Sequence, residues 1–204
     1  MPLQSNFKSD LEREKELCLL LDRYYNQYLN HYTFERISDM KQQMAGIDLI
    51  FTHKTSGKQY HIDEKAQLDY VNENLPTFAF ELSYEKNGIL KEGWLFDTSK
   101  TTEFYALITS IYADAPNVFT SCKITLVNRQ KLVHLLTERN LNSAILKRYT
   151  LPGENIHGKI KIEELHHRSE GYLYASTKNK VEKPLNLILK LDFLEEMGVA
   201  KRLA

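Results

Sequence analysis

The first third of the chain opens with a long amphipathic stretch. Between residues 8 and 30, apolar side chains recur at the three- and four-residue spacing of one helix face. They are Leu11, Cys18, Leu21, Tyr25 and Tyr28. This spacing predicts an amphipathic helix. A shorter helix is predicted from about Phe34 to Met44, ending at Gly46, a residue that suits a change of chain direction.

From Gly46 onward the pattern becomes that of strands. Residues 47–51 (IDLIF) and 59–66 (QYHIDEKA) flank a polar turn at 55–58, which predicts an antiparallel hairpin. Alternating apolar residues at 77–83 (TFAFELS) predict a further strand. Additional strands are expected at 103–111 and 123–127. The hairpin therefore belongs to a larger sheet.

The remainder of the chain mixes one helix with short β-rich pieces. Leucines at helical spacing predict a helix at 129–139. After Pro152-Gly153, strands are expected at three places, followed by a short C-terminal helix; the strands are 159–162, 172–176 and 185–189. The predicted fold class is α/β or α+β, with a mixed central sheet flanked by helices. We expect a single domain, with a core at about 8–140 and a β-rich C-terminal extension at about 150–204.

Composition narrows the class of protein. The 204 residues are 42% hydrophobic and 26% charged, which is an ordinary globular balance. The two cysteines, Cys18 and Cys122, lie far apart, and no disulfide is expected. No apolar run is long enough for a membrane helix, and the N-terminus lacks the pattern of a signal peptide, so we expect no membrane partner and a cytoplasmic location.

Charge is divided unevenly along the chain, although the formal net charge is zero. Residues 1–122 hold 12 basic and 18 acidic residues, whereas residues 123–204 hold 15 basic and 9 acidic residues. An acidic part suits binding of divalent cations, and a basic part suits contact with a phosphate backbone. The alternative explanation is that the charged residues are unevenly distributed along the sequence by chance and do not form matching surfaces in the folded protein.

The predicted hairpin carries the residues that could bind a cation or take part in a reaction. Side chains two apart on a strand share a face, so His61, Asp63, Lys65 and Gln67 project together. Hairpin pairing would bring Asp48 beside Asp63. Carboxylates within apolar strands are costly to bury unless they are paired or bind a cation. Two such groups suit Mg²⁺ or Mn²⁺, which can activate water, while an ammonium offsets developing negative charge.

These residues resemble the PD-(D/E)xK nuclease superfamily, which includes many restriction enzymes and repair nucleases. Asp48 takes the place of the first aspartate, although Ile47 replaces the preceding proline, and Asp63-Glu64-Lys65 forms the D/E-x-K element. Gln67 extends the match to D-x-K-x-Q, and residues 36–48 resemble the lead-in of several branches. The resemblance covers roughly residues 8–112. Its core is a helix, three antiparallel strands, a second helix and a further strand.

The resemblance implies a metal-dependent endonuclease. Asp48 and Asp63 would bind Mg²⁺ or Mn²⁺, Lys65 would assist the attacking water, and Gln67 would position the site. The expected substrate is nucleic acid, with DNA favoured over RNA. Nucleases that cut two strands often pair, so a homodimer is among the expected assemblies. A catalytically silent nucleic-acid-binding or assembly module on the same fold is the alternative.

Two further points stay open in the sequence. Helical phase places Glu14 inside the apolar face of the first helix, where it would either complete the metal site or pair with Arg36 or a tyrosine. Asp48 and Asp63 could instead be hairpin charges paired with Lys65 or Lys58. A second D-x-K at residues 39–41 lies in a predicted helix, where residues two apart do not share a face.

Overall fold

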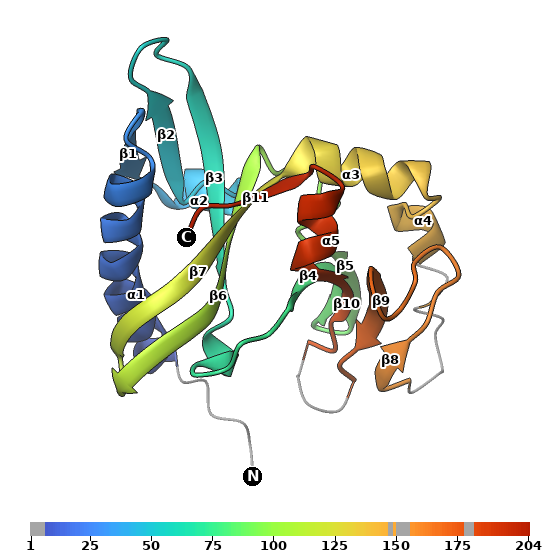
Figure 1. Ribbon diagram of the computed structural model, residues 1–204. Coiled ribbons are helices and arrows are strands. Elements are labelled where there is room, and N and C mark those ends of the chain that lie inside the picture. The colour runs from blue at the N-terminus through green and yellow to red at the C-terminus, as the bar shows by residue number, and fades with distance from the viewer. Residues whose placement is uncertain (1–6, 147–148, 150–155, 178–181) are drawn as a thin grey trace.

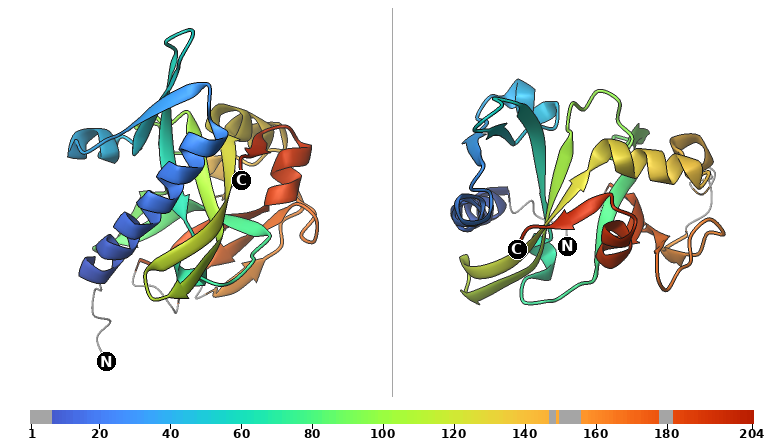
Figure 2. Two further views of the ribbon diagram at one scale, coloured as in Figure 1. Left: turned by 60° about the vertical axis from the view of Figure 1, so that its left-hand side comes forward. Right: turned by 45° about the horizontal axis from the view of Figure 1, so that its top comes forward.

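The computed structural model describes residues 7–146, 149, 156–177 and 182–204, and it shows a mixed α/β chain with two sheets. Figure 1 shows the first sheet between the long N-terminal helix α1 (Phe7–Tyr28) and the second sheet, and the two views in Figure 2 agree with this arrangement. No helix in these described ranges is both long and apolar enough to cross a membrane.

In the part of the chain that the structure describes, the first sheet has six strands in the order β1-β2-β3-β6-β7-β11. Its strands are β1 (Tyr32–Arg36), β2 (Leu49–His53), β3 (Gln59–Ala66), β6 (Phe104–Ala115), β7 (Val118–Asn128) and β11 (Ala200–Arg202). Strands β1, β2 and β3 form an antiparallel meander, and β6 runs parallel to β3. The predicted hairpin at 47–66 is therefore confirmed, and it lies next to a parallel strand.

Within the described residues, the second sheet has five strands in the order β5-β4-β10-β9-β8. Its strands are β4 (Thr77–Lys86), β5 (Ile89–Glu92), β8 (Gly158–Ile160), β9 (Gly171–Ala175) and β10 (Leu185–Lys190). Because β10 lies between β4 and β9, the C-terminal strands share a sheet with the segment that follows β3. The strand predictions at 77–83, 159–162, 172–176 and 185–189 are confirmed with small shifts of their ends.

Two hydrophobic clusters hold these layers together. On one face of the first sheet, α1 buries Leu17, Leu20, Leu21 and Tyr25 against strands that include β2 and β3. The other cluster joins the first sheet, the second sheet, α3 (Arg129–Glu138) and α5 (Leu191–Glu196). The described ranges also contain the short helices α2 (Met40–Met44), η1 (Leu68–Tyr70) and α4 (Ser143–Leu146).

One prediction of local structure is wrong, one element of the resembling family's core is missing from the described residues, and one strand was not predicted. The expected helix at Phe34–Met44 is instead strand β1 followed by the five-residue α2, because Tyr32 and Phe34 pack with Phe51 in a strand pairing. In the described part of the chain, no α-helix separates β3 from β6; η1, β4 and β5 fill this connection. The C-terminal helix α5 is followed by β11, which pairs with β7 and was not predicted.

Candidate active site

The β2–β3 register places Asp48 opposite Asp63. Leu49 pairs with Ile62, so the residue just before β2 faces the next residue of β3. The backbone N–H of Asp48 donates to Ile62 at 2.8 Å, and the Oδ2 atom of Asp48 accepts from the backbone N–H of Glu64 at 2.7 Å. Asp48 is thus fixed to β3 through its backbone and its side chain.

Asp63 and Lys65 form an ion pair on the face of β3 that the strand alternation predicts. The Nζ atom of Lys65 donates to Oδ1 of Asp63 at 2.5 Å. Asp63 is buried, with 3% of its surface exposed, whereas the Lys65 side chain is 29% exposed. The Lys65 ammonium also lies 5.5 Å from the centre of the Trp94 ring. Lys65 is therefore the part of this pair that solvent or a ligand can reach.

The electrostatics of the two carboxylates favour a cation. Burial, and next the adjacent Asp63 carboxylate, raise the pKa of Asp48 to about 6, although the Glu64 N–H and Lys65 act in the opposite direction. One ammonium thus faces two carboxylates. A divalent cation would neutralise the surplus negative charge, and carboxylate oxygens are the ligands that Mg²⁺ prefers. Asp48 and Asp63 would supply two carboxylate ligands, and water and backbone carbonyls are the usual remaining ligands of such an ion.

The turn that precedes β2 packs closely against Asp63. Gly46 has a φ of 78°, and a Cβ atom there would lie 3.5 Å from Oδ2 of Asp63 and would collide with Oγ1 of Thr102. Thr102 donates to the Gly46 carbonyl at 2.7 Å, and Nζ of Lys100 donates to the Met44 carbonyl at 2.6 Å. These bonds hold the end of α2 beside the two carboxylates.

Glu64, the middle residue of the D-x-K element, lies on the opposite face and fastens α1 to the sheet. Its Oε1 accepts from the Tyr25 hydroxyl at 2.7 Å, and its Oε2 accepts from Arg36 at 2.7 Å. Arg36 also pairs with Asp22 of α1. Burial, and next the charge of Glu64, raise the pKa of Tyr25. This network was not predicted, although strand alternation turns Glu64 toward the predicted helix.

Two cavities are lined in part by Lys65. A cavity of about 540 Å³ on the α1 side is lined by residues that include Glu14, Asp48, Glu64 and Lys65. A second cavity of about 350 Å³ is lined by residues that include Lys65 and Trp94. Lys65 therefore lines both cavities, whereas Asp48 lines only the first and Asp63 lines neither.

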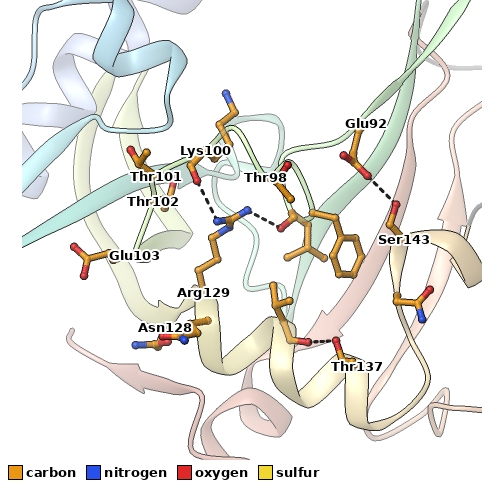
Figure 3. Close-up of a pocket in the computed structure, with 15 residues that line it drawn as sticks. Glu92, Thr98, Lys100, Thr101, Thr102, Glu103, Asn128, Arg129, Thr137 and Ser143 are labelled. Carbon is orange, nitrogen blue, oxygen red and sulfur yellow. Dashed lines mark hydrogen bonds between the residues drawn. The ribbon is translucent and has the colours of Figure 1, made fainter.

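A further cavity, of about 780 Å³, is lined by residues that include Leu95, Lys100 and Arg129 (Figure 3). Arg129 at the start of α3 crosses this cavity wall and donates to the carbonyls of Asp97, Lys100 and Leu95 at 2.7, 3.3 and 3.4 Å. Because these bonds fix the backbone at 95–100, Arg129 holds the segment that contacts Lys65 and α2. Asp48 and Asp63 do not line this cavity, so it is separate from the candidate site.

Comparisons with known proteins give no match. No protein-family model, no curated protein and no solved structure matches this chain.

The expectation that Glu14 points into the apolar face of the first helix is wrong. Glu14 is exposed, because α1 turns Leu17, Leu20, Leu21 and Tyr25 toward the sheet and leaves Glu14 at the margin. It still lines the same cavity as Asp48. Among the described residues, no group of three or more His, Cys, Asp or Glu side chains could hold a metal. The expected pairing of Glu14 with Arg36 is replaced by the pairs of Arg36 with Asp22 and Glu64.

Gln67 lies just beyond β3 and connects this strand to the second sheet. Its Nε2 donates to the carbonyl of Thr77, the first residue of β4, at 2.9 Å. Its Oε1 is buried and has no hydrogen-bond partner in the described part of the structure. The structure therefore brings Asp48, Asp63 and Lys65 together, whereas the Gln67 amide is directed to the β4 backbone.

Proposed function

We propose that this chain is a metal-dependent endonuclease that hydrolyses phosphodiester bonds in DNA, using Mg²⁺ or Mn²⁺. The observation that carries the proposal is the register of β2 and β3, which sets Asp48 opposite Asp63 with Lys65 bonded to Asp63. Two adjacent carboxylates with an accessible ammonium combine a hard cation site with a group that can contact a phosphate.

The order of elements supports a core of the restriction-endonuclease-like, PD-(D/E)xK type. Helix α1 precedes the antiparallel β1-β2-β3 meander, and β6 runs parallel to β3. This order matches the helix, three antiparallel strands and further strand of that core. The difference lies in the connection, where β4 and β5 replace the second helix. They carry Trp94 close to Lys65 on the segment that follows β5.

Each side chain of the site has a distinct part in the proposed reaction. Asp48 and Asp63 would hold the cation, which when bound lowers the pKa of a water ligand and stabilises negative charge on a phosphoryl oxygen. Lys65 would then exchange part of its contact with Asp63 for the substrate, orienting the attacking water and offsetting the charge that develops on the phosphate. Glu64 would hold β3 in place from the other face.

Replacing Asp63 with asparagine is expected to abolish metal-dependent cleavage while preserving the side-chain shape. We expect the wild-type chain to cut a labelled panel of DNA and RNA substrates in Mg²⁺ or Mn²⁺ and to stop cutting in chelator, because the carboxylates act through the cation. The Asp63→Asn chain should show no such cleavage.

The control is Asp69→Asn, which changes a carboxylate on η1 that lies outside the proposed site and is expected to leave the cleavage rate unchanged. Wild-type protein that binds nucleic acid in a salt-dependent way but cuts nothing in either metal would replace the proposal with a non-catalytic binding module. Cleavage that survives in Asp63→Asn would place the active site elsewhere.

A further inference from the structure

The ring of Trp94 is held in place by the hydrophobic core. Trp94 is the only tryptophan in the sequence, and it is half-buried. Its ring meets the Tyr105 ring edge-on with 4.8 Å between the ring centres, and the Phe80 ring at 5.5 Å. Tyr105 and Phe80 are fully buried, and the Tyr105 hydroxyl donates to the Trp94 carbonyl at 3.4 Å. Because these partners belong to the packed core, the indole has little freedom to move.

The backbone on either side of Trp94 is bonded to β4. The N–H of Gly93 donates to the Leu82 carbonyl at 2.8 Å. The N–H of Leu95 donates to the Glu81 carbonyl at 3.3 Å. A Cβ atom on Gly93 would lie 2.3 Å from the same Glu81 carbonyl oxygen, so the segment can approach β4 this closely only with glycine at this position. The place of Trp94 beside β4 is therefore fixed by its backbone as well as by its ring.

Lys65 extends from β3 to this ring. Its Nζ lies 5.5 Å from the centre of the Trp94 ring and 2.5 Å from Oδ1 of Asp63. An ammonium within about 6 Å of the centre of an aromatic face is attracted by the ring. A lysine side chain is otherwise flexible, because a long carbon chain separates its charge from the backbone. The carboxylate and the ring together therefore define where the ammonium lies.

The cavity of about 350 Å³ that Lys65 shares with Trp94 offers the ammonium other partners. Among the described residues, four carboxylates and three lysines line it: Glu81, Glu92, Asp97 and Glu182, with Lys65, Lys86 and Lys100. These carboxylates would attract an ammonium that left Asp63. The Trp94 ring gives Lys65 a contact beside Asp63 that opposes this movement.

We propose that Trp94 is a positioning residue for Lys65, and that its ring keeps the ammonium beside Asp63 when this carboxylate binds a cation. The inference rests on the proposed nuclease function. The ion pair of Lys65 with Asp63 weakens when a cation shares the carboxylate, since two positive charges repel each other, and the ring is then the contact that remains. Trp94 follows β5, in the connection that replaces the second helix of the resembling core. The second sheet thus supplies a residue to the candidate site.

The contact is measured by NMR on the full wild-type chain, in chelator and without substrate. The ring current of an indole shifts protons that lie over its face upfield. We expect the ε-methylene signals of Lys65, identified by their loss in Lys65→Met, to lie upfield of those of Lys86, which lines the same cavity. Trp94→Leu should return the Lys65 signals to the position of the Lys86 signals. Trp94→Phe keeps a ring and should keep part of the shift.

Cleavage kinetics test whether the contact serves the reaction. At saturating Mg²⁺, Trp94→Leu should lower kcat about tenfold. KM and the Mg²⁺ concentration that gives half the maximal rate should stay unchanged, because Trp94 contacts the ammonium and not the metal-binding oxygens. Trp94→Phe should retain most of the rate. In the Lys65→Met background, Trp94→Leu should have no further effect, since the ammonium on which the ring acts is absent.

The matched control is Phe78→Leu, which also removes an aromatic side chain from the core of the second sheet. Phe78 is buried and packs on Phe80 with 5.7 Å between the ring centres, and it does not line the cavity that Lys65 and Trp94 share. This variant should keep the wild-type kcat. The wild-type NMR spectrum and the Trp94→Phe variant decide the question if Trp94→Leu does not fold.

The possible outcomes separate this inference from the proposed function. Lys65 signals that coincide with those of Lys86 in the wild type would overturn it, as would an equal loss of kcat on Trp94→Leu with and without Lys65→Met. If the wild type cleaves DNA and Trp94→Leu cleaves as fast as Phe78→Leu, the nuclease stands and the positioning role fails. If the upfield shift is lost in Trp94→Leu but the wild type cuts nothing, the hold of the ring on Lys65 stands and the nuclease fails.

Discussion

Replacing Lys65 with methionine is expected to lower the rate of DNA cleavage by about 10²–10³-fold at saturating Mg²⁺. Methionine keeps an unbranched side chain beside Trp94 but removes the ammonium that is bonded to Asp63. Asp48 and Asp63 stay in place, so the cation should still bind. The measurement is the initial rate of cleavage over a range of Mg²⁺ concentrations, which separates loss of rate from loss of metal affinity.

The control for this prediction is Lys58→Met on the same hairpin. Lys58 is exposed, lies over the Tyr60 ring and has no contact with the two aspartates. Its removal should leave the cleavage rate close to that of the wild type. A Lys65→Met variant that cuts as fast as Lys58→Met would show that the ammonium of Lys65 takes no part in the reaction.

Replacing Glu64 with alanine is expected to lower the free energy of unfolding by about 3 kcal/mol. The change leaves the buried Tyr25 hydroxyl without its acceptor and removes one carboxylate from Arg36, which retains Asp22. Because a buried donor that loses its partner keeps its desolvation cost, the loss should exceed that of an exposed ion pair. Urea denaturation in chelator measures this stability without a contribution from bound metal.

A double-mutant cycle with Tyr25→Phe identifies the source of that loss. In the wild-type background, Tyr25→Phe removes one hydrogen bond and should cost about 1 kcal/mol. In the Glu64→Ala background the hydroxyl has no acceptor, so the same change should cost nothing or should stabilise the fold. Equal costs in the two backgrounds would show that Glu64 acts on stability without the Tyr25 contact.

The hairpin at the centre of the site could be predicted because its information is local. Alternation on β3 determines which side chains share a face with Asp63, and the Gly-containing turn determines the pairing with β2. Asp48, Asp63 and Lys65 therefore lie together as the alternation indicates. The long helix α1 was equally clear, since its apolar stripe repeats over many turns.

The remaining differences depend on contacts between distant segments. Phe34 fits a helical pattern as well as a strand, and only its packing with Tyr25 and Phe51 decides for a strand. Strand β11 has three residues and forms only because α5 returns the chain to β7. Glu14 lies at the edge of the α1 stripe, where a single helical turn decides between burial and exposure. The residues adjacent in sequence do not determine the strand conformation of Phe34, the formation of β11 or the exposure of Glu14.

The most direct test of the central claim is to locate manganese in crystals of the wild-type chain by anomalous diffraction, with Asp63→Asn crystals as the control. We predict an anomalous peak between the carboxylates of Asp48 and Asp63, within contact of both, which is absent from Asp63→Asn. A peak at another group of side chains, or no peak at manganese concentrations that support cleavage, would contradict the proposal that these two aspartates form the metal site of a nuclease.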